Sequence, residues 1–102
     1  MRKLAELLAR VEGVTPQGGR AVSYESLGVV WIAPGPVKRA VRTGGEGAAE
    51  ALSLTAECRA DGRLTEGRLL RWDGADWRIA LVDAAAHGRP LGRARLMLER
   101  ER

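Results

Sequence analysis

Residues 69–83, LLRWDGADWRIALVD, constrain the fold more than any other part of this chain. The pair Asp73-Gly74 lies between two runs in which apolar and polar side chains alternate. Asp-Gly readily supplies the two positive-φ residues that the tight turn of a β-hairpin requires. Leu69–Trp72 and Ala75–Asp83 are therefore predicted to be the two arms of a hairpin. In the second arm, Trp77, Ile79 and Leu81 are expected to share one face.

Trp72 and Trp77 flank this turn, on opposite arms of the predicted hairpin. An aromatic side chain beside a cross-strand neighbour stabilises such a ribbon, so the two residues are interpreted as structural rather than as an aromatic binding site. Asp73 and Asp76 also allow a carboxylate pair for acid–base chemistry. Aspartate is favoured in turns for local capping, and the structural interpretation is preferred.

Most other segments also have a strand pattern. An apolar, β-branched run at 27–33 (LGVVWIA) predicts a buried strand that ends at Pro34-Gly35-Pro36. Alternation predicts two more strands with one wet face, at 51–60 and 91–99. Leu4, Leu7, Leu8 and Val11 have helical spacing instead, so the first segment is expected to be a helix. The chain is predicted to be all-β, a small antiparallel β-barrel or sandwich of about six strands.

The length of 102 residues fits one domain, 1–102, and no apolar stretch is long enough to span a membrane. The N-terminus is too polar for a signal peptide, so a cytoplasmic protein is expected. Cys58 and His87 are the only residues of their types, which excludes an internal disulfide and makes a Cys–His nucleophile a weak hypothesis. No catalytic residues, metal site or cofactor are predicted. The scattered arginines indicate a GC-rich genome more than nucleic-acid contact.

Residues 37–50 have no regular period and are predicted to form one long, mobile, Gly-rich loop between strands. The loop lacks the Lys-Ser/Thr of a phosphate-binding loop. Its basic residues allow either a solvated surface or phosphate contacts, and the first is slightly preferred. The candidate functional residues of the loop are Lys38, Arg39, Arg42, Thr43, Gly44, Gly45, Glu46 and Gly47.

The order of these segments resembles the phage head–tail joining family, whose members are also called head-completion or stopper proteins. The resemblance begins with Gly18-Gly19 and with Trp31 in a short strand before a proline. It continues with a Trp/Tyr-x-Gly-x-x-Trp/Tyr-x-Ile hairpin, here from Trp72 to Ile79, and with a last strand that ends in acidic residues. It covers nearly the whole chain. Such proteins occur in long-tailed phages and in gene transfer agents of GC-rich bacteria.

The resemblance implies a small antiparallel β-barrel that assembles as a ring, with a hexamer preferred over a dodecamer. The ring joins the DNA-filled head to the tail, below a portal-bound adaptor protein and above a tail terminator or tail tube protein. The long loop, residues 37–50 here, is implied to face the channel and help retain packaged double-stranded DNA. The first segment of the family is usually a strand, in conflict with the helical pattern of residues 2–10.

Two other interpretations remain open. The basic charge allows a small nucleic-acid-binding module of OB or SH3-like type, which a salt-dependent shift on DNA or RNA would identify. The same small β-domain also suits another virion ring, such as a tail terminator.

Overall fold

The computed structural model describes residues 1–43, 48–84 and 92–101, and describes side chains except at 40–50 and 101. The elements within these ranges are all strands. In chain order they are β1 (Lys3–Val14), β2 (Arg20–Pro34), β3 (Lys38–Thr43), β4 (Ala48–Arg59), β5 (Leu69–Trp72), β6 (Ala75–Asp83) and β7 (Arg93–Glu101). The prediction of an all-β fold is therefore confirmed.

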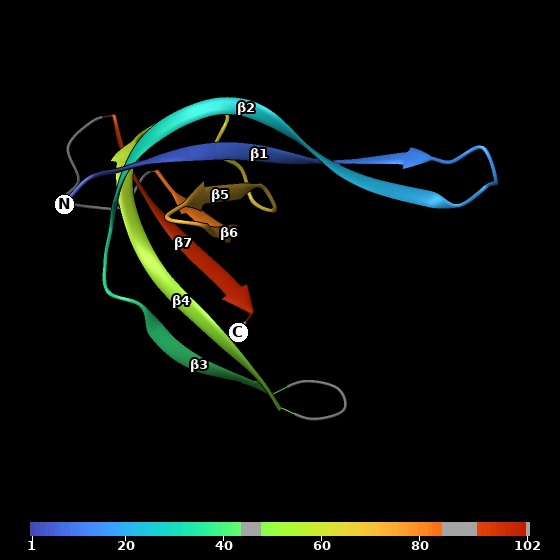
Figure 1. Ribbon diagram of the computed structural model, residues 1–102. Helices are drawn as coiled ribbons and strands as arrows, with labels where there is room; N and C mark the ends of the chain where they lie inside the picture. The colour runs from blue at the N-terminus through green and yellow to red at the C-terminus, as the bar shows by residue number, and fades with distance from the viewer. Residues whose placement is uncertain (44–47, 85–91, 102) are drawn as a thin grey trace.

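All the strand pairs are antiparallel and form one sheet in the order β2-β1-β5-β6-β7-β4-β3. A further pairing between β2 and β4 joins Ile32–Pro34 to Ala56–Cys58 and curls the sheet back on itself (Figure 1). Six strands thus form a small barrel, and β3 lies outside this ring on the edge of β4.

At Gly35, the strand that pairs with one edge of β4 changes from β2 to β3. β2 pairs with the end of β4, and β3 pairs with its beginning, so the chain passes along the same edge of β4 twice. Between them, Gly35 donates its backbone N–H to the Thr55 carbonyl oxygen at 2.7 Å. A Cβ at Gly35 would lie 3.0 Å from that oxygen, which is too close for comfortable packing. The predicted end of the strand at Pro34-Gly35-Pro36 is confirmed.

The core lies inside the barrel and is formed by the inward side chains of alternating positions. The predicted alternation is confirmed on β4, where Leu54, Ala56 and Cys58 are buried, and on β7, where Ala94, Leu96 and Leu98 are buried. These side chains face one another in the order Leu54–Leu98, Ala56–Leu96 and Cys58–Ala94. The core cluster also contains Ala5, Leu7, Val30, Ile32, Leu64, Leu70, Trp72, Trp77 and Ile79.

The helix expected over residues 2–10 is wrong, because this segment is strand β1. Its pairs with β2 extend from Lys3 to Val14, so backbone pairing along the whole segment overrides the helical spacing of its leucines. Strand alternation then turns Ala5 and Leu7 inward and leaves Leu4 47% exposed. Leu8 is buried but lies outside the core cluster.

Two β-bulges change which side chains face the core. On β6, Ile79 pairs with Leu98 and Leu81 pairs with Met97, so Ala80 is an extra residue. The expectation that Leu81 faces inward is therefore wrong: Leu81 is 45% exposed, and Val82 packs against the core instead.

The other bulge lies on β2. Glu6 pairs with Val29 but Leu8 pairs with Ser26, which leaves one extra β2 residue at Leu27-Gly28. Gly28 has a φ of 105°, a backbone conformation that glycine adopts without strain. The run 27–33 is also not a fully buried strand, because Val30 and Ile32 point inward while Val29 and Trp31 are exposed. Only one side of β2 faces the barrel interior.

The prediction of a structureless loop over residues 37–50 is corrected in part. Lys38–Thr43 forms β3 and pairs with Ala48–Ser53 of β4, so both ends of the supposed loop belong to a hairpin. Residues 44–47 lie outside the described residues. The alternation that identifies other strands is missing from this stretch of the sequence, and β3 pairs only along the edge of β4, outside the ring of six strands.

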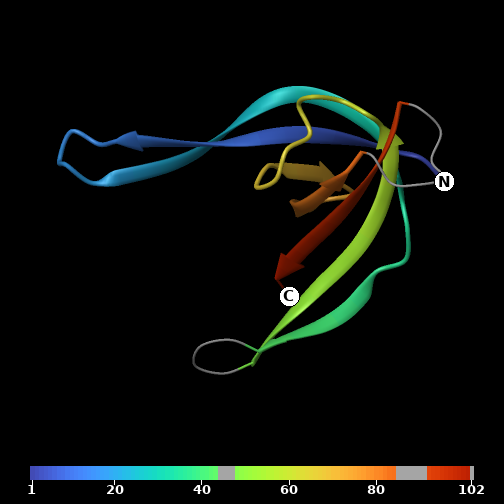
Figure 2. The ribbon, with the colours of Figure 1, turned by 180° about the vertical axis from the view of Figure 1, so that it is seen from behind.

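Two hairpins leave the barrel on the same side, β1–β2 and β3–β4 (Figures 1 and 2). The molecule measures 51 × 34 × 25 Å, and its radius of gyration of 15.3 Å exceeds the roughly 13 Å expected for a compact chain of about 100 residues. The excess reflects these projections. The longer one, residues 9–25 of β1, β2 and their turn, is called the arm below.

Candidate assembly surfaces of the barrel

The hairpin around Asp73-Gly74 is confirmed. Asp73 and Gly74 have φ angles of 51° and 77°, as a tight turn with two positive-φ residues requires. Trp72 and Trp77 stack across the two strands with ring centroids 5.7 Å apart and an interplanar angle of 17°. Both rings are buried, and the Arg100 guanidinium lies 5.6 Å from the centroid of the Trp77 ring. These residues and Ile79 build the barrel wall and core rather than a binding site.

Asp73 and Asp76 are held by separate basic residues. Lys3 Nζ lies 3.0 Å from Asp73 Oδ2, and Arg71 Nε donates to Asp76 Oδ1 at 2.6 Å. The hydrogen bonds from Arg71 lower the pKa of the Asp76 carboxyl, which keeps it ionised. A carboxyl with a lowered pKa is a poor general acid, so the geometry supports ion pairing rather than acid–base chemistry.

Cys58 lies in the core and is 2% exposed. Burial raises the pKa of its thiol, and the nearby charge of Asp61 raises it further. The thiol is therefore protonated and shielded at neutral pH, unlike a nucleophile. His87 lies outside the described residues.

The predicted channel-facing residues are distributed along and beyond β3. Lys38 and Arg39 are exposed, and strand alternation places them on opposite faces of the β3–β4 hairpin. The backbone of Arg42 and Thr43 pairs with Ala49 and Ala48 near the end of this hairpin. Gly44, Gly45, Glu46 and Gly47 lie outside the described residues. The structure thus attaches the basic residues to a projecting hairpin.

An arginine clamp that no sequence pattern indicates joins the 60–68 connection to β2. Arg63 binds both carboxylate oxygens of Asp61, and the Asp61 Oδ1 atom also accepts the Arg63 backbone N–H at 2.9 Å. These hydrogen bonds lower the pKa of Asp61 and raise that of Arg63. The guanidinium also donates to the carbonyl oxygens of Leu27 at 2.7 Å and of Val29 at 3.4 Å. The Asp-Gly-Arg order of residues 61–63 indicates the turn but not its partner 36 residues away.

An apolar patch that was not predicted from the sequence lies on the outside of the barrel. Trp31 is 60% exposed and pairs directly with Leu4, which lies on the neighbouring strand. Val29 is two residues from Trp31 on the same strand, so it lies on the same face, and it is 54% exposed. We call these three residues the Trp31 patch. Scattered exposed apolar residues are ordinary, but a contiguous patch with an exposed tryptophan is typical of an interaction surface.

A hollow of about 430 Å³ adjoins this patch. Besides the patch, its lining includes Arg2, Glu57, Arg59, Asp61, Arg63 and Arg93. Arg59 and Arg93 are directly opposite each other on β4 and β7. Like charges at such a position repel, and the described residues contain no ion pair for either side chain.

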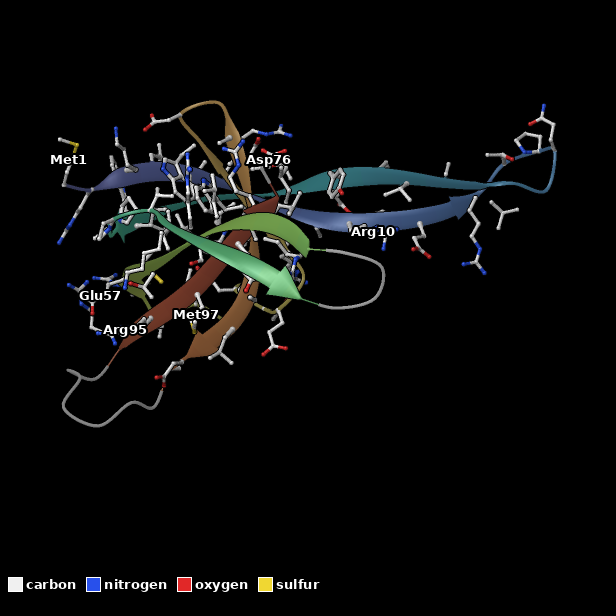
Figure 3. The ribbon with its side chains drawn as sticks, turned by 90° about the horizontal axis from the view of Figure 1, so that it is seen from below. Met1, Arg10, Glu57, Asp76, Arg95 and Met97 are labelled. Atoms are coloured by element: carbon white, nitrogen blue, oxygen red, sulfur yellow. The ribbon has the colours of Figure 1, made fainter. Side chains whose placement is uncertain are left out.

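Among the strands that the structure describes, the arm is a two-stranded ribbon with no third strand beside it. β1 pairs with β5 only through Glu6–Leu8, so beyond this point β1 and β2 pair with each other alone. Val11, Val14, Val22 and Tyr24 are exposed along it. The arm extends to one end of the molecule, whereas Glu57 and Arg95 lie toward the other end (Figure 3). An isolated ribbon of this kind is marginally stable in water, so the arm is suited to packing against another surface.

Neither a metal site nor a membrane-spanning helix is present in the part of the chain that the structure describes. Among residues 1–43, 48–84 and 92–101, no three His, Cys, Asp or Glu side chains are arranged to hold a metal ion. Within the same ranges, no helix is long and apolar enough to cross a membrane.

No protein-family model matches the sequence, and no curated protein matches it either. A similar fold is found among solved structures, in a chain of the "Virion of native gene transfer agent (GTA) particle". The two chains superpose with a TM-score of 0.71 at 19% sequence identity, and the match covers 98% of this chain and 94% of the other. Coverage this complete includes both hairpins as well as the barrel. This protein therefore shares the fold of a gene transfer agent virion chain.

Proposed function

We propose that this protein is a structural component of a phage-like particle, in the neck between the DNA-filled head and the tail. The observation that carries the proposal is the fold shared with a gene transfer agent virion chain over 98% of this chain. The head–tail joining resemblance in the sequence points to the same class of particle. The site chemistry agrees, since the candidate carboxylates are ion-paired and Cys58 is buried.

A ring assembled from copies of this chain, six by preference, is the proposed form in the particle. Support comes from the arm, which carries exposed apolar side chains and has no covering layer among residues 1–43, 48–84 and 92–101. A barrel of this size buries only a modest core, and packing of the arm against a neighbouring copy adds to the buried apolar surface. Two different surfaces that meet around a closed rotation produce such a ring.

The β3–β4 hairpin is the proposed channel-facing element. It projects from the barrel, and Lys38 and Arg39 are exposed on it. Basic side chains on a projecting hairpin are placed to approach the phosphates of packaged double-stranded DNA. The proposed protein partners are an adaptor on the head side and a tail terminator or tail tube protein on the other.

The test uses particles produced by a strain that carries this gene. Deletion of the gene is expected to yield full heads without attached tails, or heads that lose DNA, in electron micrographs, and a plasmid copy should restore complete particles. Mass spectrometry of purified wild-type particles should find the protein at a few copies per particle. If the protein is absent from purified particles, or the deletion leaves particles intact and infectious or transducing, the proposal is wrong.

A further inference from the structure

We propose that the Trp31 patch and its adjoining hollow bind a carboxylate-bearing segment of a different protein. The inference concerns a docking surface and rests on the proposed role in a multi-protein particle. Its elements are an exposed tryptophan, two aliphatic neighbours and three arginines, Arg2, Arg59 and Arg93, that have no carboxylate partner in the described residues.

The apolar half of the surface comes from β1 and β2. Leu4 and Trp31 are a directly opposite pair, and Val29 lies two residues along the strand from Trp31. Their exposed fractions are 47%, 60% and 54%. Half-exposed side chains of this size in one cluster offer an apolar anchor point, and tryptophan is the residue type that most often dominates a protein interface.

The basic half of the surface comes from β4, β7 and the N-terminus. Ile32 pairs with Cys58, so their neighbours Trp31 and Arg59 lie next to each other across β2 and β4. Arg59 is opposite Arg93 in turn, which gives a row from Leu4 through Trp31 and Arg59 to Arg93 across four strands. Like charges at directly opposite positions repel, and neither guanidinium group has a carboxylate partner in the described residues, so a carboxylate placed between them is favourable.

The other charged residues around the hollow are already paired. Glu57 binds Arg95 at 3.3 Å, and Asp61 binds Arg63 at 2.7 Å. The uncompensated charge of the hollow is thus positive and belongs to Arg2, Arg59 and Arg93. Charge complementarity therefore requires a partner that brings carboxylates.

Two other possible occupants, a second copy of this chain and nucleic acid, fit the chemistry of this surface less well. A second copy of this chain is a poor source of the missing charge, because the chain itself is basic with a net charge of +4. The exposed arm carries Arg10 and Arg20 against Glu12 and Glu25, so it is neutral. Nucleic acid suits the arginines but leaves Leu4 and Val29 uncovered, and one tryptophan is not a stacking platform for successive bases. An acidic segment with apolar side chains satisfies both halves of the surface.

Photo-crosslinking in assembled particles tests the proposal. Trp31 is replaced by the photoreactive residue p-benzoylphenylalanine, and Leu81, which is 45% exposed and does not line the hollow, receives the same replacement as the control. Both variants are first checked for an unchanged melting temperature and for their presence in purified particles. The expected result is an adduct at position 31, absent at position 81, whose mapped peptide belongs to a different particle protein and contains Asp or Glu beside apolar residues.

A double variant with reversed charge supplies the second part of the test. Arg59→Glu with Arg93→Glu should reduce the yield of that adduct about tenfold or more, whereas Thr65→Glu, at an exposed position that does not line the hollow, should leave it unchanged. An adduct with a second copy of this chain, an adduct with DNA, or no adduct in particles that contain the variant would overturn the inference. Absence of the protein from particles would instead count against the proposed function, so the two failures are distinguishable.

Discussion

Arg63 donates a hydrogen bond from Nη1 to the carbonyl oxygen of Leu27 at 2.7 Å, although the two residues are 36 positions apart in the chain. The contact fixes the 60–68 connection against the bulge in β2. Gly28 makes it possible, because a Cβ at position 28 would lie 2.8 Å from Arg63 Nη1. The bulge, Gly28 and Arg63 thus together hold the 60–68 connection against β2.

This relationship predicts that Gly28→Ala destabilises the protein by roughly 1 kcal/mol or more, because the positive φ strains an alanine and its Cβ would displace the Arg63 guanidinium from Leu27. The control is Gly13→Ala, where a Cβ meets no atom within 4 Å. Denaturant midpoints measure both changes. Arg63→Ala should also lower the midpoint, and combining it with Gly28→Ala should cost less than the sum of the two. Equal midpoints for the two glycine variants would contradict the clamp.

Trp77→Ala is expected to lower the free energy of unfolding by about 3–5 kcal/mol, because it removes a buried ring that stacks on Trp72. Trp31→Ala is the matched control, since the same substitution at a 60% exposed position should change stability far less. Thermal or chemical denaturation measures both. Similar losses for the two variants would mean that Trp31 is part of the core.

The stability of the protein should fall in acid as Asp61 and Asp76 become protonated. Hydrogen bonds from Arg63 and Arg71 lower the pKa of these carboxyls in the folded state, while their unfolded pKa is about 3.9. The stabilisation is therefore fully present above about pH 4 and is lost as the pH falls through the lower folded values. Melting temperatures between pH 7 and pH 2 should show this decline. In the variant with Asp61→Asn and Asp76→Asn, the decline should be shallower, and an identical slope would contradict the assignment.

The Cys58 thiol should react slowly with a thiol reagent in the native protein and rapidly in denaturant, because burial both shields it and raises its pKa. Cys58→Ser should fold with a modest loss of stability, because a hydroxyl replaces the buried thiol. Absorbance during labelling gives the rates. Fast labelling at neutral pH without denaturant would place the thiol at the surface.

Charge reversal on the β3–β4 hairpin should affect DNA retention without affecting folding. Lys38 and Arg39 are exposed, so Lys38→Glu with Arg39→Glu should leave the melting temperature nearly unchanged. In particles, the proposed channel position predicts loss of packaged DNA, measured as nuclease-sensitive DNA per particle. Thr65→Glu, at an exposed position outside the arm and the β3–β4 hairpin, is the control for added negative charge. Normal DNA content in the hairpin variant would contradict the proposal that β3 faces the DNA channel.

Local patterns in the sequence determined most of the strands and one turn completely. The Asp73-Gly74 turn, the inward residues of β4 and β7, and the end of β2 at Pro34 were all predicted, because each depends on alternation or turn chemistry within a few residues. The structural role of Trp72 and Trp77 followed from the same hairpin.

The features that were not predicted from the sequence depend on pairing between strands that are far apart in the chain. The leucines of residues 4–8 have helical spacing, yet β2 offers a full row of backbone partners and makes the segment a strand. The extra residue at Ala80 exposes Leu81, a shift that no local pattern indicates because a bulge depends on the register with β7. Trp31 reads as a buried residue in an apolar run, but closure of the barrel through β2 and β4 turns it outward beside Arg59. A side chain's face is fixed by its strand's partners, and those partners lie tens of residues away in the sequence.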